Sequence, residues 1–156
     1  ERGVGTTFHV YIPRYEAEPA EETIFSEQQE LPRGSETLLL VEDEASVRDM
    51  IALFLQEAGY KVLMAGTPEA AIDIAEEYGS DIALLVTDMV MPGMNGRELS
   101  EHLRSKQPSL RCLYISGYTA KIMANRGILE EGKDFLSKPF GPEEVASKVR
   151  EILDRK

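Results

Sequence analysis

The sequence predicts an α/β fold in which a doubly wound, parallel sheet of five strands is covered by helices on both faces. Two observations predict it. From residue 37 onward, short apolar runs alternate with stretches of helical periodicity, which is typical of strand–helix–strand units. The apolar runs are also nearly continuous, as in strands that are buried on both faces. With 156 residues, 42% of them hydrophobic, the chain can bury such a core and have residues to spare.

The alternation places five strands and five helices after residue 36. The strands are expected at residues 37–41, 61–65, 82–87, 110–115 and 134–137, and the helices at residues 47–58, 67–78, 95–106, 120–127 and 142–153. In the first helix, apolar residues recur every three or four positions and so share one face, and Gly59 ends the helix. In the second helix, Thr67 is the expected N-cap and Pro68 the first helical residue.

The bounds of the remaining elements are predicted from the Pro, Gly and Asn residues that begin or end them. The third strand leads directly into Asp88, where a loop rich in Pro and Gly begins. The next helix is expected to begin at Asn95 and to end before Pro108, because proline disfavours helical backbone in the residue before it. The fourth helix has the weakest pattern. The last helix begins at Pro142, and its apolar residues lie on one face.

Composition divides the chain into three parts, which we expect at residues 1–15, 16–36 and 37–156. The middle part holds seven Glu residues against one Arg, which is typical of a solvated linker. In the first part, apolar residues alternate with His9 and Tyr11, which predicts a single strand. A lone strand has nothing to pair with, so either its sheet has been cut away or it docks on the main domain.

Composition also excludes several classes of function. No apolar run approaches the roughly 20 residues of a membrane helix, and there is no signal peptide, so we expect a cytoplasmic segment without membrane contact. The net charge of −11 argues against direct nucleic-acid binding, which needs basic patches, and we expect no DNA-binding output domain. The single Cys112 lies in an apolar run, which favours a core position and a reducing compartment.

Polar side chains follow four of the five strands at the point where each strand ends. Glu42 and Asp43 follow the first strand, Asp88 the third, Ser116 the fourth and Lys138 the fifth. The carboxyl ends of parallel strands lie at the same edge of a sheet, where open α/β sheets place their active sites. We therefore expect three carboxylates, one hydroxyl and one ammonium to face one crevice.

This set of groups fits phosphoryl transfer. Three close carboxylates repel one another, so at neutral pH they need a cation or raised pKa values, and oxygen ligands favour Mg²⁺ over softer metals. Lys138 adds a mobile positive charge and Ser116 a hydroxyl donor. Transfer to an aspartate requires positive charge around the incoming phosphoryl group and a carboxylate in line with it. We therefore predict that Asp88 is a phosphate acceptor.

Each of these signals has an ordinary structural explanation when taken alone. An acid after a strand is usually a turn or cap residue, and Lys-Pro after a strand is usually plain surface. Residues 42–44 could simply favour the N-terminus of the first helix. All of them together, at strand ends of one parallel sheet, favour the site.

Four motifs in order make residues 37–156 similar to a response-regulator receiver domain. They are Leu-Val-Glu-Asp-Glu at 40–44, Asp-Met-Val-Met-Pro-Gly-Met-Asn-Gly at 88–96, Ile-Ser-Gly-Tyr at 115–118 and Lys-Pro-Phe at 138–140. The resemblance implies the flavodoxin-like fold with strand order 2-1-3-4-5. It also implies a part in a two-component phosphorelay, in which the domain catalyses only its own phosphorylation and dephosphorylation.

The resemblance assigns the metal and acceptor roles. Asp88 is the implied phosphoacceptor. Asp43 and Asp88 are implied direct ligands of Mg²⁺, together with the backbone carbonyl of Val90, and Glu42 acts through water.

It also assigns roles around the phosphoryl group. Ser116 and Lys138 are implied to bind that group. Ser116 and Phe135 match the two switch positions of the family, although Phe135 lacks the hydroxyl of a tyrosine and fits ordinary core packing equally well. Val90 and Tyr118 lie two residues after Asp88 and Ser116, so their side chains could hinder the hydrolytic water and slow dephosphorylation.

A second resemblance concerns the N-terminal part. The string Gly-Val-Gly-Thr-Thr-Phe-His-Val-Tyr-Ile-Pro at 3–13 resembles the end of the ATP-binding domain of sensor histidine kinases. It implies the C-terminal receiver of a hybrid sensor histidine kinase, whose parent could be anchored in a membrane. The implied partner is a phosphohistidine, on the kinase dimerisation domain or on a histidine phosphotransfer protein. Neither His9 nor His102 fits that donor, since one lies in the predicted strand and the other on a helix.

Three other functions occur with this topology, and the residues at the strand ends fit each of them less well. A receiver fold used only for docking would not need intact acids, Ser116 and Lys138. A flavin-binding relative would need a hydroxyl- and glycine-rich phosphate loop after the first strand, where residues 42–44 would repel a phosphate without metal. A phosphatase with paired acids after the first strand is disfavoured because Asp88 follows the third.

Overall fold

The computed structural model describes residues 8–9, 11, 32–117 and 134–155. The chain divides into two compact units, residues 1–30 and 31–156. In the first unit, the described residues Phe8, His9 and Tyr11 are not in a strand, and the rest of the strand predicted there lies outside the described residues.

The second unit is built on a five-stranded sheet in the order β2-β1-β3-β4-β5, and all four neighbouring pairs are parallel. The strands are β1 Thr37–Val41, β2 Lys61–Ala65, β3 Ile82–Asp88, β4 Arg111–Ser116 and β5 Phe135–Ser137. Both the fold class and the strand order implied by the resemblance are confirmed.

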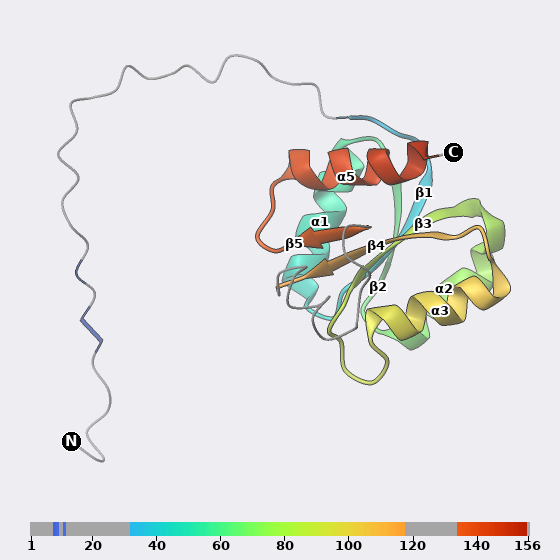
Figure 1. Ribbon diagram of the computed structural model, residues 1–156, viewed down its shortest axis with the longest axis horizontal. Helices are drawn as coiled ribbons and strands as arrows, with labels where there is room; N and C mark the ends of the chain where they lie inside the picture. Colours follow the sequence, from blue (N-terminus) through green and yellow to red (C-terminus); the bar gives the residue numbers. More distant parts are fainter. Residues whose placement is uncertain (1–7, 10, 12–31, 118–133, 156) are drawn as a thin grey trace. The chain divides into compact units, whose positions relative to one another are not determined.

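Helices cover both faces of this sheet (Figure 1). They are α1 Ala45–Glu57, α2 Pro68–Tyr78, α3 Gly96–Lys106 and α5 Pro142–Asp154, with a short 3₁₀ helix at Gly79–Asp81. In Figure 1, α1 and α5 lie on one face of the sheet, and α2 and α3 lie on the other. The helix predicted at 120–127 lies outside the described residues.

Two hydrophobic clusters fill the space between the sheet and the helices. Successive residues of the central strands point to opposite faces, so Leu38 and Leu40 pack with α1 and α5, whereas Leu39 and Val41 pack with α2 and α3. All four side chains are buried. This two-sided burial is the physical reason why the strands are apolar without interruption.

The predicted helix caps are present. The Thr67 side chain accepts a hydrogen bond from the Ala70 backbone N–H, and Pro68 is the first residue of α2. Asn95 and Glu98 form a reciprocal capping box, each side chain accepting a backbone N–H of the other at 3.0 Å. The first helix begins at Ala45, two residues before the predicted start, because the apolar pattern does not include its first polar turn.

The packed unit also includes the last residues before β1. The Gly34 backbone N–H donates to the Ala58 carbonyl at 3.0 Å, and the Lys61 N–H donates to the Glu36 carbonyl at 3.1 Å. Glu36 also pairs with Arg150 of α5 at 2.8 Å. Within the described residues, no helix is long and apolar enough to cross a membrane.

Candidate functional site

The sheet topology brings the predicted site residues to one edge. Asp88 is the last residue of β3 and Ser116 the last of β4, while Glu42 directly follows β1 and Lys138 directly follows β5. Carboxylate oxygens of Glu42, Asp43 and Asp88 all lie within 4.8 Å of one another. We call these three residues the acid cluster.

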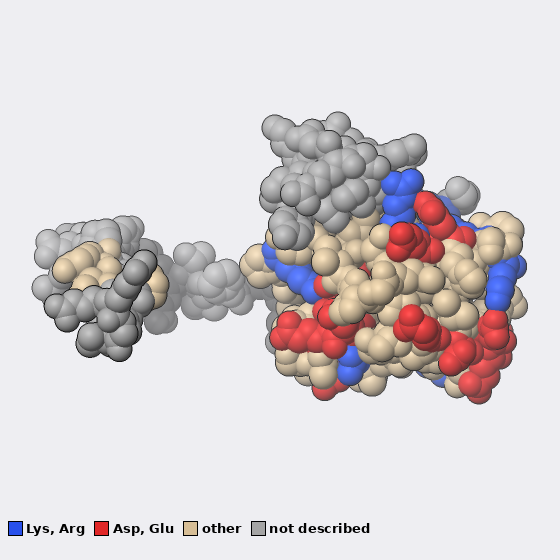
Figure 2. All heavy atoms as spheres, turned by 90° about the horizontal axis from the view of Figure 1, so that it is seen from below, with Lys and Arg blue, Asp and Glu red and all other residues tan. Residues whose placement is uncertain are grey.

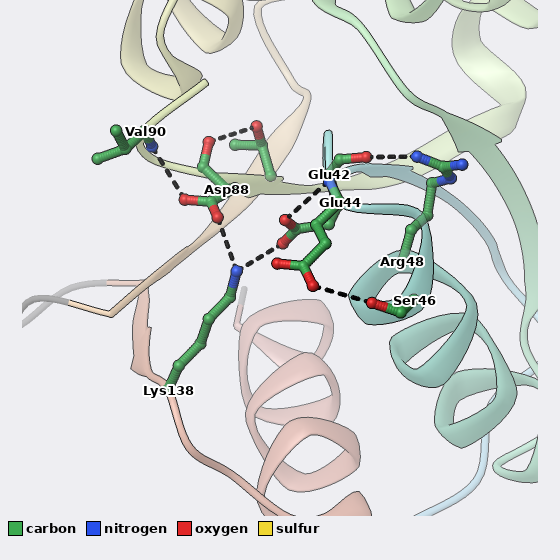
Figure 3. Close-up of polar contacts among 8 residues, drawn as sticks. Glu42, Glu44, Ser46, Arg48, Asp88, Val90 and Lys138 are labelled. Carbon is green, nitrogen blue, oxygen red and sulfur yellow. Dashed lines mark hydrogen bonds and ion pairs between the residues drawn. The ribbon is translucent and has the colours of Figure 1, made fainter. Parts of the chain in front are cut away.

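Lys138 lies between two members of the acid cluster (Figure 3). Its Nζ atom is 2.6 Å from Oε2 of Glu42 and 2.7 Å from Oδ2 of Asp88. The exposed fractions of the side chains are 25% for Lys138, 3% for Glu42 and 11% for Asp88. Because Glu42 and Asp88 are largely withdrawn from water, the ammonium is an important source of compensation for their charge.

The electrostatics of the site follow from burial and crowding. Burial raises the pKa of Glu42, and repulsion from Asp88 raises it further, although the hydrogen bond from Lys138 opposes both. Burial acts to lower the pKa of Lys138, but the hydrogen bonds to Asp88 and Glu42 outweigh it and raise that pKa. The Lys138 ammonium, shared by two carboxylates, therefore stays protonated. It does not fully offset the effect of burial and repulsion on Glu42, whose pKa stays raised.

The Asp88 carboxylate is held in place by its own loop. Its Oδ1 atom accepts the backbone N–H of Val90 at 2.9 Å (Figure 3), which leaves Oδ2 toward Lys138. The Thr87 hydroxyl donates to the Asp88 carbonyl at 3.0 Å. A Cβ at Gly96 would overlap that same carbonyl oxygen, so α3 begins against the Asp88 backbone only because residue 96 has no side chain.

Sequence reasoning missed the roles of Thr87 and Gly96. Thr87 is a fully buried hydroxyl in an apolar strand next to Asp88, and that position was a usable signal. Gly96 lies in the Pro- and Gly-rich loop after Asp88, and the sequence does not reveal its close approach to the Asp88 carbonyl, which depends on how α3 folds back.

The other predicted site residues differ in their burial. Ser116 is fully buried, and its carbonyl accepts the Lys138 backbone N–H at 2.8 Å. Phe135 is partly buried and packs against the cluster on the α2–α3 side, in agreement with the core-packing alternative. Val90 is exposed, with 57% of the residue accessible to solvent. Tyr118 lies outside the described residues.

The donor set fits a hard divalent cation. The acid cluster offers only oxygen ligands, the type that Mg²⁺ and Ca²⁺ prefer. Three carboxylates against one ammonium leave a net local charge near −2, which such an ion would neutralise. Asp43 is exposed, whereas Glu42 and Asp88 are buried, so an ion could approach from the Asp43 side.

The acid cluster lies neither in the described cavity nor on a basic surface. A cavity of about 370 Å³ lies between α2 and α3, but its lining includes Leu39, Ile82 and Leu103 and none of the acid cluster. Figure 2 shows acidic side chains in several patches on one face of the second unit, with basic side chains in smaller groups. The described residues of that face form no broad basic patch of the kind that binds nucleic acid.

Comparisons with known proteins agree with this geometry. A family model described as the response regulator receiver domain matches residues 38–150. A sensor kinase, CckA of Brucella abortus (strain 2308), is 34% identical over 162 residues, which cover 99% of this chain and 17% of that protein. Other curated relatives match 76% of this chain and about half of their own length.

Solved structures show the same similarity. The receiver domain from the hybrid histidine kinase CckA is 36% identical with a TM-score of 0.64, covering 76% of this chain and 99% of that one. The response regulator TrrA of Thermotoga maritima, solved in complex with Mg²⁺-BeF, is 25% identical with a TM-score of 0.63, covering 75% and 98%. From the acid cluster at the strand ends and these matches together, the chain belongs to the response regulator receiver domain family.

Proposed function

We propose that the unit from residue 37 to residue 156 is a phosphorelay receiver that accepts a phosphoryl group from phosphohistidine onto Asp88, with Mg²⁺ as cofactor. The observation that supports it most is the setting of the Asp88 carboxylate. One of its oxygens is held by the Val90 N–H and the other lies against Lys138, and Glu42 and Asp43 complete a cluster that fits a divalent ion.

In the proposed reaction, a carboxylate oxygen of Asp88 attacks the phosphorus atom. The O–P bond forms while the N–P bond of the donor imidazole breaks, and the imidazole keeps the electron pair of the broken bond. Lys138 stabilises the negative charge of the transferring group, because its ammonium already lies 2.7 Å from the attacking carboxylate. Ser116, one residue beyond the register partner of Asp88 on β4, would donate its hydroxyl to a phosphoryl oxygen.

Asp43, Asp88 and the Val90 carbonyl would bind the Mg²⁺ ion directly, and Glu42 would act through water. When bound, the ion would offset the charge of the acids and polarise phosphoryl oxygens. The requirement on the chain is to keep its carboxylates close despite their mutual repulsion, and the Lys138 ammonium, in contact with both Glu42 and Asp88, helps to do so.

We further propose that Ser116 and Phe135 respond to phosphorylation and that Val90 and Tyr118 control its lifetime. Phe135 has no hydroxyl, so its response is limited to a change in ring packing. The Val90 side chain is exposed beside Asp88, where it can obstruct a water molecule on its way to an acyl phosphate.

The proposed context is a hybrid histidine kinase, with residues 1–15 from the end of its ATP-binding domain and residues 16–36 as an acidic linker whose last residues, Gly34 and Glu36, are bonded to the receiver. The match to the Brucella sensor kinase supports it, because that match covers 99% of this chain. The transcriptional regulators cover 76%. The proposed donor is a phosphohistidine on the kinase dimerisation domain or on a phosphotransfer protein.

The proposal is tested by incubating the chain with a small phosphodonor and Mg²⁺ and measuring the intact mass. The wild type should gain one phosphoryl group and Asp88→Asn should gain none. Asp81→Asn is the matched control, because Asp81 is an exposed aspartate immediately before β3, at its opposite end, and this variant should be labelled like the wild type. Full labelling of Asp88→Asn would refute the assignment.

A further inference from the structure

The main chain that leads into the acid cluster is held from two sides. The Glu42 N–H donates to the Ala65 carbonyl at the end of β2 at 3.2 Å. The Glu42 carbonyl accepts a hydrogen bond from Nη1 of Arg48 at 2.7 Å, and Arg48 reaches back from the first turns of α1 (Figure 3). This bond is short because the donor is charged.

The hydrogen bond from Arg48 fixes the whole peptide unit between Glu42 and Asp43. The Glu42 carbonyl and the Asp43 N–H belong to one planar peptide unit. A guanidinium that anchors this oxygen therefore sets the tilt of the plane from which the Asp43 backbone continues. Asp43 is exposed, so its position depends on the backbone more than on packing around its side chain.

Gly66 leaves the space that this arginine needs. The three atoms nearest to a Cβ placed at Gly66 would all belong to the Arg48 guanidinium, with Nη1 at 3.0 Å, Cζ at 3.6 Å and Nη2 at 3.9 Å. Gly66 is not one of the glycines with positive φ, so its backbone would accept alanine. A methyl group at residue 66 would therefore require the Arg48 guanidinium to shift by a few tenths of an ångström.

We propose that Arg48 is a positioning residue for the cation site, and that the absence of a side chain at Gly66 leaves room for the Arg48 guanidinium to reach the Glu42 carbonyl. This inference rests on the proposed function, because it assumes that the acid cluster binds Mg²⁺. Mg²⁺ demands nearly ideal ligand geometry, and groups that orient metal ligands commonly change the affinity by about 10- to 100-fold.

The direction in which the Mg²⁺ affinity changes when Arg48 is removed distinguishes a positioning role from a simple effect of its charge. Arg48 is a cation that contacts the backbone of one member of the acid cluster, so its charge alone repels Mg²⁺, and removing that charge would strengthen binding. If Arg48 instead positions the ligands, removing it weakens binding. A purely structural role would change the free energy of unfolding and leave the affinity alone.

The experiment is a double-mutant cycle on the full chain, with Mg²⁺ affinity measured by calorimetry and unfolding by urea followed in EDTA. The variants are Arg48→Met, Gly66→Ala and the two combined. Each single variant should weaken Mg²⁺ binding about tenfold. The double variant should bind no more weakly than Arg48→Met, because an alanine Cβ at residue 66 then has no guanidinium to displace.

Three further variants complete the design. Lys148→Met removes one positive charge from α5, where Lys148 pairs with Glu151, and should leave the affinity unchanged. Arg48→Lys keeps the charge and one donor and should give an intermediate affinity, which also serves if Arg48→Met does not fold. Asp43→Ala should abolish binding and marks the loss of the site.

The outcomes are distinct. Unchanged or tighter Mg²⁺ binding by folded Arg48→Met and Arg48→Lys would overturn the inference while the proposed function stands. A second, additive loss from Gly66→Ala in the Arg48→Met background would overturn the role of Gly66. Absence of Mg²⁺ binding by the wild type would overturn the proposed metal site and this inference with it.

Discussion

Nζ of Lys138 lies 2.7 Å from Oδ2 of Asp88, although the two residues are 50 positions apart in the sequence. The parallel sheet produces this pair, because β3 ends at Asp88 and β5 ends one residue before Lys138. The same ammonium also contacts Glu42. One cation thus stabilises two buried carboxylates, and under the proposed function it would also contact a phosphoryl group on Asp88.

The first prediction concerns this shared ammonium. Lys138→Met should lower the free energy of unfolding by about 1–3 kcal/mol, because Glu42 would be left buried without its partner. Adding Glu42→Gln should restore part of the loss, since burial and repulsion from Asp88 already raise the pKa of Glu42. Urea unfolding of the two variants measures both effects. No gain from Glu42→Gln in the Lys138→Met background would contradict the account.

The second prediction concerns the contact between α3 and the Asp88 backbone. Gly96→Ala should destabilise the fold by about 1–3 kcal/mol and reduce phosphorylation, because the added methyl group overlaps the Asp88 carbonyl. Gly117→Ala is the matched control, since a Cβ there meets nothing within 4 Å. Equal stability of the two variants in urea would show that the close approach at Gly96 is unimportant.

The third prediction concerns the single cysteine. Cys112 is fully buried, and burial raises the pKa of its thiol to about 12. Almost no thiolate forms at neutral pH, so a thiol reagent should label the native chain only as fast as the chain unfolds. Labelling is followed by absorbance with and without urea. Rapid reaction of the native protein would place Cys112 outside the core.

The fourth prediction concerns the lifetime of the phosphorylated state. Val90→Asn should shorten the half-life of the acyl phosphate, because a polar side chain beside Asp88 can admit and orient a water molecule. Since 57% of Val90 is accessible to solvent, the change should leave the free energy of unfolding within about 0.5 kcal/mol of the wild type. Loss of phosphate is followed after removal of the donor, and an unchanged half-life would exclude Val90 from this control.

Local sequence signals predicted the elements well. Thr67 caps its helix as predicted, because a cap depends on neighbouring residues alone. Asn95, where the next helix was expected to begin, is the N-cap of that helix. The five strands predicted after residue 36 agree with the observed ones to within a residue at either end, whereas the described residues of the strand predicted near the N-terminus are not in a strand. The strand order came from the family resemblance, since the pairing of β1 with β3 is a long-range contact that periodicity does not report.

The interior of the site was less predictable. Which polar groups follow the strands was visible in the sequence, and the parallel sheet brings Glu42, Asp88 and Lys138 into contact. The residues that hold the backbone around these groups could not be identified from the sequence. Gly96 and Arg48 act through close approaches between elements, and such contacts depend on how the helices pack against the strand ends.

The central claim is that Asp88 accepts the phosphoryl group, and chemical mapping of the modified residue tests it most directly. The chain is phosphorylated with a small phosphodonor and Mg²⁺, and the acyl phosphate is reduced with borohydride, which converts a phosphorylated aspartate to homoserine. Peptide mass spectrometry then locates the homoserine. The account predicts homoserine at residue 88. Homoserine at another aspartate, or a phosphoryl group that borohydride does not remove, would contradict it.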